Sequence, residues 1–438
     1  MAHEARFIRA DRDQTRFEMI DLEGMLPADH QARVVWEFVG TLDLSALYEA
    51  IKSVEGAAGR PASDPAVLMA LWLYATIDGV GSARELDRLC NHNPAYRWLA
   101  GGVPLNHHML SDFRVEHETL LDRLLTESVT ALKVAGTISL AEVAIDGTKV
   151  RANASRDSFK TESKLEQVEA EMEQRIAALK SEVHSDTSAS SRRKHAARKR
   201  AAEEVKGRAQ VARVTLNQLR AERAERAKTH PKDEAKKSEP KASLTDSQAR
   251  VMCFPDGAMR PAYNAQIAIT PREGIIVSVE MTDRRNDSGL AGPVVEDIVR
   301  RYGETPETLL VDTHYATSED ICELAEHPAG PVTVYAPPPK DREDVKPETI
   351  AERAKKRERE PPAVKEWRAR MATASAKALY RRRKLIERIN AHLKNHGFGF
   401  MPVRGIRKAK AVALWHALAN NLIAAHRLRT QSVSMAIP

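Results

Sequence analysis

A long charged segment is the feature that most restricts how this chain folds. Residues 158–230 are rich in charge, and their apolar residues recur every three or four positions, as in a coiled-coil seam. The seam consists of Leu165, Val168, Met172, Ile176, Leu179 and Val183. A polar break at 185–191 precedes a second helical run at 193–228, which predicts a helical hairpin. Residues 229–243 are polar and are expected to form a flexible linker.

The charged segment interrupts a series of strand and helix patterns. Before it, residues 138–146 are typical of a strand that ends at Asp146. After it come strand patterns at 263–269, 274–279, 308–311 and 332–335. Helical patterns lie between them at 287–302 and 317–326, and an amphipathic helix is expected at 411–426. This order predicts an α/β domain with a mixed sheet flanked by helices.

The region before the first strand is predicted to be all-α. Ser63-Asp64-Pro65 favours a helix start, and Gly79-Val80-Gly81 ends that helix. Ser82 and Glu85 have the spacing of a capping box for the next helix. Helix, glycine-containing turn and helix is a helix-turn-helix pattern, but a plain helical bundle fits equally well.

Composition and cysteine content narrow the class of protein. The net charge of +7 and the pI near 9.2 suit a polyanionic partner, although a soluble protein without a nucleic-acid role has the same balance. The three cysteines are far apart, which argues against a disulfide framework or a zinc knuckle. No secretory signal or membrane span is visible, so we expect a cytoplasmic protein.

A stripe of four polar residues near the C-terminus has the pattern of a chemical site. Tyr380, Arg383, Glu387 and Lys394 have the spacing Y-x2-R-x3-E-x6-K within a predicted helix at 364–395. Steps of three, four and seven residues stay on one helix face. A carboxylate holds divalent metals, whereas the cations and the phenol bind phosphates, so the stripe suits phosphoryl transfer on a nucleic acid.

Two aspartates complete a candidate set of three carboxylates. Asp146 and Asp312 each follow a hydrophobic strand pattern, and acids at the ends of neighbouring strands point into one cleft. With Glu387 they would repel one another unless they share Mg²⁺ ions about 4 Å apart. Taken singly, an Asp at a strand end is usually a turn or cap residue, and a Glu in a basic helix is usually a solvated ion-pair partner, so the hypothesis depends on the three acids occurring together.

Several motifs together resemble the DDE transposases of bacterial insertion sequences. These are AIDGTKVRANAS at 144–155, TDSQARVM at 245–252, YNAQIAI at 263–269, Asp312 with THY, and the Y-x2-R-x3-E-x6-K signature. RPASDPAVLMALWLYA at 60–75 and HMLSDFR at 108–114 resemble the family's N-terminal domain. One departure is that Thr313 and His314 precede Tyr315, where relatives commonly have Ala-Gly, which puts the loop geometry in question.

The resemblance implies a fold, a site and partners. It implies a ribonuclease-H-like catalytic domain in which Asp146, Asp312 and Glu387 bind two Mg²⁺ ions, which Mn²⁺ can replace. Tyr380, Arg383 and Lys394 would hold DNA phosphates. Water would free a 3′-OH at a transposon end, and this 3′-OH would attack target DNA. The implied partners are terminal inverted repeats and target DNA, bound by a homodimer that is associated with the nucleoid when it is on DNA.

The expected domain bounds follow from these patterns. They are an N-terminal segment at 1–60, a helical DNA-binding domain at 61–135, a catalytic domain at 136–157 and 244–428, and an inserted hairpin with linker at 158–243. Two other functions remain open. The chain can be a ribonuclease-H-like nuclease without strand transfer, or an inactive DNA-binding regulator.

Secondary features carry less weight. Arg192–Lys194 and Arg198–Arg200 form a basic cluster that suits DNA phosphates or a solvated face. His107-His108 is expected in a loop rather than at a metal. Trp415 is expected in the core. A phosphate contact is plausible for the basic residues that follow the stripe, which are Arg404, Arg407, Lys408 and Lys410.

Overall fold

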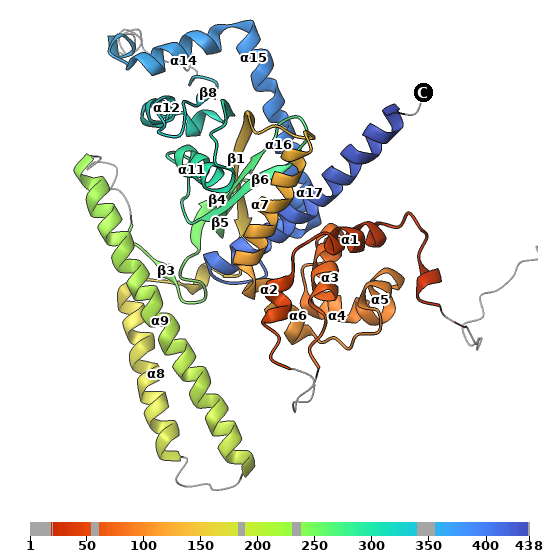
Figure 1. The fold of residues 1–438 in the computed structure, drawn as a ribbon. Coiled ribbons are helices and arrows are strands. Elements are labelled where there is room, and N and C mark those ends of the chain that lie inside the picture. Colours follow the sequence, from red (N-terminus) through yellow and green to blue (C-terminus); the bar gives the residue numbers. More distant parts are fainter. Residues whose placement is uncertain are drawn as a thin grey trace, which may run out of the picture.

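A mixed sheet lies at the centre of the protein (Figure 1). The computed structural model describes residues 19, 21–53, 61–182, 189–229, 238–339 and 355–436. The strand order is β4-β5-β1-β7-β8, and β6 also pairs with β5. The strands are β1 (Glu142–Arg151), β4 (Arg250–Cys253), β5 (Met259–Ile269), β6 (Ile276–Thr282), β7 (Thr308–Leu310) and β8 (Thr333–Tyr335). β5 is antiparallel to β1, β4 and β6, whereas β7 is parallel to β1 and β8.

The first strand differs from the sequence prediction. The prediction that it ends at Asp146 is wrong, because β1 continues to Arg151. Its second half pairs with β5, from Thr148 opposite Ala265 to Arg151 opposite Ala262. This ladder satisfies the backbone of a polar stretch that has no strong strand pattern of its own. Asp146 therefore lies in the middle of the strand.

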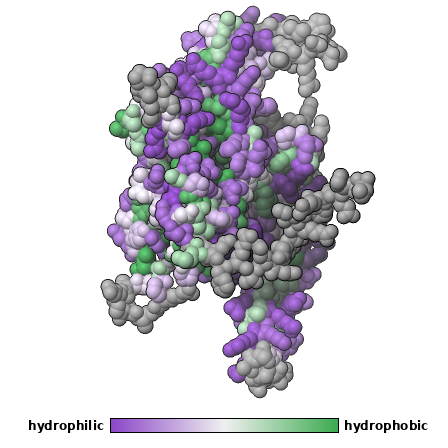
Figure 2. Space-filling view, turned by 90° about the vertical axis from the view of Figure 1, so that its right-hand side faces the viewer, coloured by the Kyte–Doolittle hydropathy of each residue, from purple (hydrophilic) through white to green (hydrophobic). Residues whose placement is uncertain are grey.

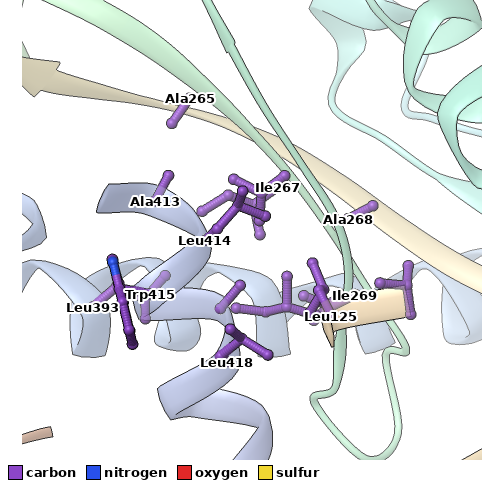
Figure 3. Close-up of a cluster of buried hydrophobic side chains, with 14 of the residues drawn as sticks. Leu125, Ala265, Ile267, Ala268, Ile269, Leu393, Ala413, Leu414, Trp415 and Leu418 are labelled. Carbon is purple, nitrogen blue, oxygen red and sulfur yellow. The ribbon is translucent and has the colours of Figure 1, made fainter. Parts of the chain in front are cut away.

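Helices from both ends of the chain pack around the sheet. α11 (Ala291–Tyr302) and α12 (Ser318–Ala325) lie between the later strands in sequence. α7 (Glu118–Val134) and the long α17 (Ile406–Ala436) pack against each other and against β6. Figure 3 shows Leu414, Trp415 and Leu418 of α17 in one cluster of buried apolar side chains with Ile267 of β5 and Leu125 of α7. The C-terminal helix is thus part of the main core, and Trp415 is buried as expected.

The N-terminal helices are joined to this core rather than separate from it. They are α1 (Gln31–Gly40), α2 (Ser45–Glu49), α3 (Pro65–Ile77), α4 (Ala83–His92), α5 (Pro94–Ala100) and α6 (His107–Glu116), preceded by the 3-10 turn η1 (Glu23–Met25). The predicted cap on α4 is confirmed, because the Ser82 hydroxyl accepts a hydrogen bond from the Glu85 amide. α1 packs on α3 and α5, and α3 and α6 both contact α17. His107 and His108 begin α6, so their expected loop position is wrong.

The charged segment forms a pair of long helices that projects from the sheet (Figure 1). α8 (Glu162–Glu182) packs along α9 (Ala189–Thr229), with Leu165 against Ala209, Ala212 and Leu216. Val183 and most of the predicted break lie outside the described residues. The face in Figure 2 is mostly hydrophilic, including this projection, and its apolar residues form narrow strips.

Part of the expected linker is ordered. Ala242–Ser243 forms β3, which pairs with β2 (Phe159–Lys160) after the short turn η2 (Arg156–Ser158). Both β3 residues are fully buried, so the prediction of a flexible linker through 243 is wrong at this end. The pairing closes the base of the helical pair, which a local sequence pattern does not reveal.

The helix predicted at 364–395 is divided. It consists of α14 (Pro362–Ala372), α15 (Ala374–Tyr380), η4 (Arg381–Arg383), α16 (Lys384–Leu393) and η5 (Lys394–Phe398). Thr373 is extended, with ψ of 150°, and its hydroxyl caps the Ala376 amide at 3.2 Å. The four residues of the stripe lie after this break, on one helical run. Residues 340–354, which precede α14, lie outside the described part of the chain.

No helix in the described ranges is long and apolar enough to cross a membrane.

A buried histidine is expected to make stability sensitive to acid. Burial lowers the pKa of His416 to about 3, from an ordinary value near 6.5. Below pH 6.5 His416 is therefore protonated in the unfolded chain, whereas in the folded chain it stays neutral down to about pH 3. We expect the free energy of unfolding to fall by about 2–3 kcal/mol between pH 7 and pH 4.5 through this group. His416→Gln should flatten that slope in urea denaturation, and an unchanged slope would contradict it.

Candidate active site

Asp146 and Asp312 come from neighbouring parallel strands. In the register of β1 and β7, Ala144 lies opposite Leu310, so the two aspartates occupy equivalent positions two residues further on. Asp312 has left the strand and caps the 3-10 turn η3 (Thr313–Tyr315), where its Oδ1 accepts from the Thr313 amide at 2.7 Å. The register therefore explains why these two acids lie near each other, although only Asp312 follows a strand end.

Arg383 connects the first aspartate to Glu387. One terminal nitrogen of its guanidinium donates to Asp146 Oδ1 at 2.6 Å, and the other donates to Glu387 Oε1 at 3.0 Å. Asn390, one turn after Glu387, donates to Asp146 Oδ2 at 2.8 Å. Only 8% of Arg383 is exposed. In this conformation Arg383 is a counter-ion of the carboxylates, which differs from its expected role as a phosphate ligand.

Burial and crowding make Asp146 unusual. The pKa of Asp146 is raised to about 6, mainly by desolvation and to a smaller extent by the negative charges of Asp287 and Asp312, while Arg383 and Asn390 oppose the shift. Burial also raises the pKa of the Tyr380 hydroxyl, with added effects from Asp312 and Glu387. Burial lowers the pKa of Lys394, which lies within electrostatic reach of Asp146. The stripe and the two aspartates therefore share one electrostatic environment.

A cavity of about 400 Å³ opens beside Glu387. Tyr380, Arg383 and Glu387 line it, together with the basic residues Lys377, Arg381 and Lys384. Cations around one carboxylate suit a phosphodiester that approaches a metal-binding acid.

The donor set fits a hard divalent cation, although its three carboxylates do not meet around one point. Within the described part of the chain, no three His, Cys, Asp or Glu side chains lie close enough to hold one metal ion together. The expected convergence is thus incomplete, because the Arg383 guanidinium occupies the space between Asp146 and Glu387. Two carboxylates that already share one cation, with Asp312 nearby, have the oxygen chemistry that Mg²⁺ prefers.

Comparison with known protein families identifies the family to which the chain belongs. Residues 225–423 match the transposase DDE domain, and residues 20–116 match a transposase domain called DUF772. The chain is a DDE transposase of the insertion-sequence type. Neither curated proteins nor solved structures give a match.

The family match defines the general chemistry of this transposase. DDE transposases act on DNA with divalent metal ions and have a ribonuclease-H-like fold, in keeping with the mixed sheet and its flanking helices. The matched DDE region contains Asp312, Glu387 and the remaining stripe residues, but it begins after Asp146. Asp146 is linked to the others by its hydrogen bonds to Arg383 and Asn390.

The structure adds a fourth acid that sequence reasoning missed. Asp287 Oδ1 accepts hydrogen bonds from Asn264 at 2.7 Å and from Gln266 at 2.9 Å. Gln266 in turn accepts from the buried Tyr315 hydroxyl. This network ties β5 to the turn after Asp312, and it gives Tyr315 a partner despite the unusual residues before it. The one available signal was an acid soon after a strand pattern, in Arg-Asn-Asp-Ser at 285–288.

Gly147 is expected to be essential for this close packing. A Cβ at Gly147 would lie 2.1 Å from Asp287 Oδ1 and 2.8 Å from Gln266 Nε2. Because hydrogen bonds hold both side chains, we expect Gly147→Ala to lower the free energy of unfolding by about 2 kcal/mol in urea denaturation. In the Asp287→Ala background the same change should cost much less, and equal costs in both backgrounds would contradict the proposed contact.

The basic residues that follow the stripe, and Trp367 before it, have varied positions. Arg404 donates to the Asn153 carbonyl, and Lys410 pairs with Glu280 at 2.8 Å, so these two are at least partly engaged within the protein. Lys408 is exposed. Trp367 is buried, and its indole donates to the Ala336 carbonyl, so it belongs to the core.

Proposed function

We propose that Asp146, Asp312 and Glu387 hold two Mg²⁺ ions, and that this site cleaves transposon ends and joins the freed 3′-OH to target DNA. The observation that carries the proposal is the Arg383 guanidinium shared by Asp146 and Glu387. Two acids from elements distant in sequence are held on either side of one positive charge. A divalent ion has the same electrostatic preference for this position.

The protein's own residues prepare the site. Asn390 fixes the orientation of Asp146, and the Asp287–Gln266–Tyr315 network fixes the turn that presents Asp312. Bound divalent ions would activate the attacking oxygen and neutralise charge at the phosphate. Tyr380, Lys394 and the basic lining of the 400 Å³ cavity would position the scissile phosphate. Arg383 would join them once metal replaces it between the acids.

The other domains would supply the DNA contacts. We infer that the helical domain at 61–135 binds the terminal repeats, and that the pair α8–α9 is an insertion in the catalytic domain at 136–157 and 244–428. The exposed basic cluster of α9, which includes Arg193 and Arg198, would lie along DNA phosphates. Bringing two ends together would require a homodimer.

A strand-transfer assay tests this function. The purified protein is incubated with a labelled duplex of the element's own end, a supercoiled target plasmid, and either Mg²⁺, Mn²⁺ or EDTA. We expect metal-dependent joining of the labelled 3′ end to the plasmid. Cleavage without joining would favour a nuclease, and binding without cleavage in either metal would favour an inactive regulator.

A further inference from the structure

A second cavity lies where the N-terminal helices meet the end of the helical run that carries the stripe of Tyr380, Arg383, Glu387 and Lys394. Its volume is about 520 Å³, and we call it the interdomain cleft. One wall is the start of α4 and part of α6, and the other is η5, Phe400 and α17. The walls meet closely, because the Gly79 carbonyl would lie 3.5 Å from a Cβ at Gly397. The cleft is therefore formed jointly by both matched regions of the transposase.

The polar lining of the interdomain cleft includes two arginines, which carry positive charge, and four histidines. It contains Arg84, His107, His108, Arg114, His396 and His416. Among the described residues that line it, there is no Asp or Glu. Trp72, Trp415 and Phe400 supply apolar surface. A pocket with guanidinium and imidazole groups and without acids favours an anion.

Arg114 is the strongest sign of a missing partner. Only 6% of the residue is exposed, yet within the described ranges its Nε has no hydrogen-bond partner. One terminal nitrogen donates to the Gly81 carbonyl, and the guanidinium lies 4.7 Å from the centre of the Trp72 ring. No carboxylate of the described residues forms an ion pair with it, and burial lowers its pKa to about 10. A buried guanidinium without an acid is costly unless an anion compensates it.

The first turn of α4 adds to this preference. Ser82, Ala83 and Arg84 all line the interdomain cleft, and α4 begins at Ala83. The amide end of a helix attracts anions, and the exposed Arg84 lies in the same turn. Arg114 lies deep in the cleft, whereas Arg84 lies at its exposed rim.

We propose that the interdomain cleft binds a backbone phosphate of DNA that extends from the active site along β1. The position of the cleft relative to β1 favours DNA over a free anion as the ligand, and this choice rests on the proposed function. β1 leads from Asp146 to Arg151, whose backbone bonds to Gly399 and Met401 on either side of Phe400. Five strand residues span about 17 Å, which is the length of about five base pairs.

The test compares Arg84→Ala with Arg88→Ala on the same helix. Arg88 is also exposed, but it pairs with Glu85 and does not line the cleft. Binding of a fluorescent duplex of arbitrary sequence is measured by anisotropy in EDTA over a series of salt concentrations. For Arg84→Ala we expect about fivefold weaker binding and a salt slope lower by about one. Arg88→Ala should match the wild type.

Two further arms make the result decisive. If Arg114→Gln still unfolds cooperatively on heating, it should weaken duplex binding by a similar factor. If it does not, the test rests on Arg84→Ala alone. Inorganic phosphate is added to the wild type at constant ionic strength, and the melting temperature is recorded. Equal salt slopes of duplex binding in Arg84→Ala and the wild type would overturn the proposal. The proposal would also fail if inorganic phosphate raised the melting temperature of the wild type while Arg84→Ala left the salt slope unchanged. If the wild type does not bind duplex at all, the proposed function fails instead.

Discussion

Asp146→Asn is expected to slow cleavage of the transposon end at least about 10³-fold. The amide keeps the shape of the side chain and still accepts from Asn390, but it cannot carry the negative charge that a divalent ion requires. Asp312→Asn and Glu387→Gln should have effects of the same order. The measurement is single-turnover cleavage of a labelled end duplex in Mg²⁺, with anisotropy as a separate reading of DNA binding.

The matched control is Asp256→Asn. Asp256 is an exposed aspartate in the turn between β4 and β5, and it pairs with Arg260. This variant should cleave at the wild-type rate. Binding of the end duplex should survive in all four proteins, because the DNA contacts are mostly basic groups elsewhere. A triad variant that cuts at the normal rate would remove that residue from the catalytic set.

Arg383→Gln is expected to destabilise the metal-free protein by about 3 kcal/mol. The change removes the cation that Asp146 and Glu387 share, and it leaves the partly buried Asp146 carboxylate without its strongest partner. Addition of Mg²⁺ or Mn²⁺ should restore more stability to the variant than to the wild type. In the wild type, the metal first has to displace the guanidinium.

The neighbouring Arg382 provides the control. Arg382 donates to Glu142 at 2.6 Å, but its side chain is 40% exposed, so Arg382→Gln should cost less than about 1 kcal/mol. Both variants are compared by urea denaturation with and without metal. Equal metal-dependent gains in Arg383→Gln, Arg382→Gln and the wild type would contradict the view that Arg383 occupies the metal position.

Local sequence patterns predicted the elements but not their pairing. The hydrophobic run before Asp312 and the cap at Ser82 are local signals, and the structure has both features. The end of β1 was misplaced because its polar second half is held by β5, more than a hundred residues later. β3 was missed for the same reason, since two residues form a strand only where β2 is already in place.

The sequence predicted which residues belong to the candidate site, but it did not predict how they are arranged in space. Helical spacing places Arg383 and Glu387 on one face, but it does not show that the guanidinium also reaches Asp146 from a distant strand. Asp287 was missed because it lies outside any regular element, and its role depends on Asn264 and Gln266 of β5. Local spacing identifies neighbours on one element, whereas the contacts between elements define the site.

Direct measurement of metal binding tests the central claim most closely. Electron paramagnetic resonance of Mn²⁺, with Mg²⁺ as competitor, is recorded for the wild type, Asp146→Asn, Asp312→Asn, Glu387→Gln and Asp256→Asn, each with and without duplex DNA. We expect the wild type and Asp256→Asn to bind Mn²⁺ equally and each triad variant to lose bound metal. Wild-type Mn²⁺ binding in all three triad variants would contradict the assignment.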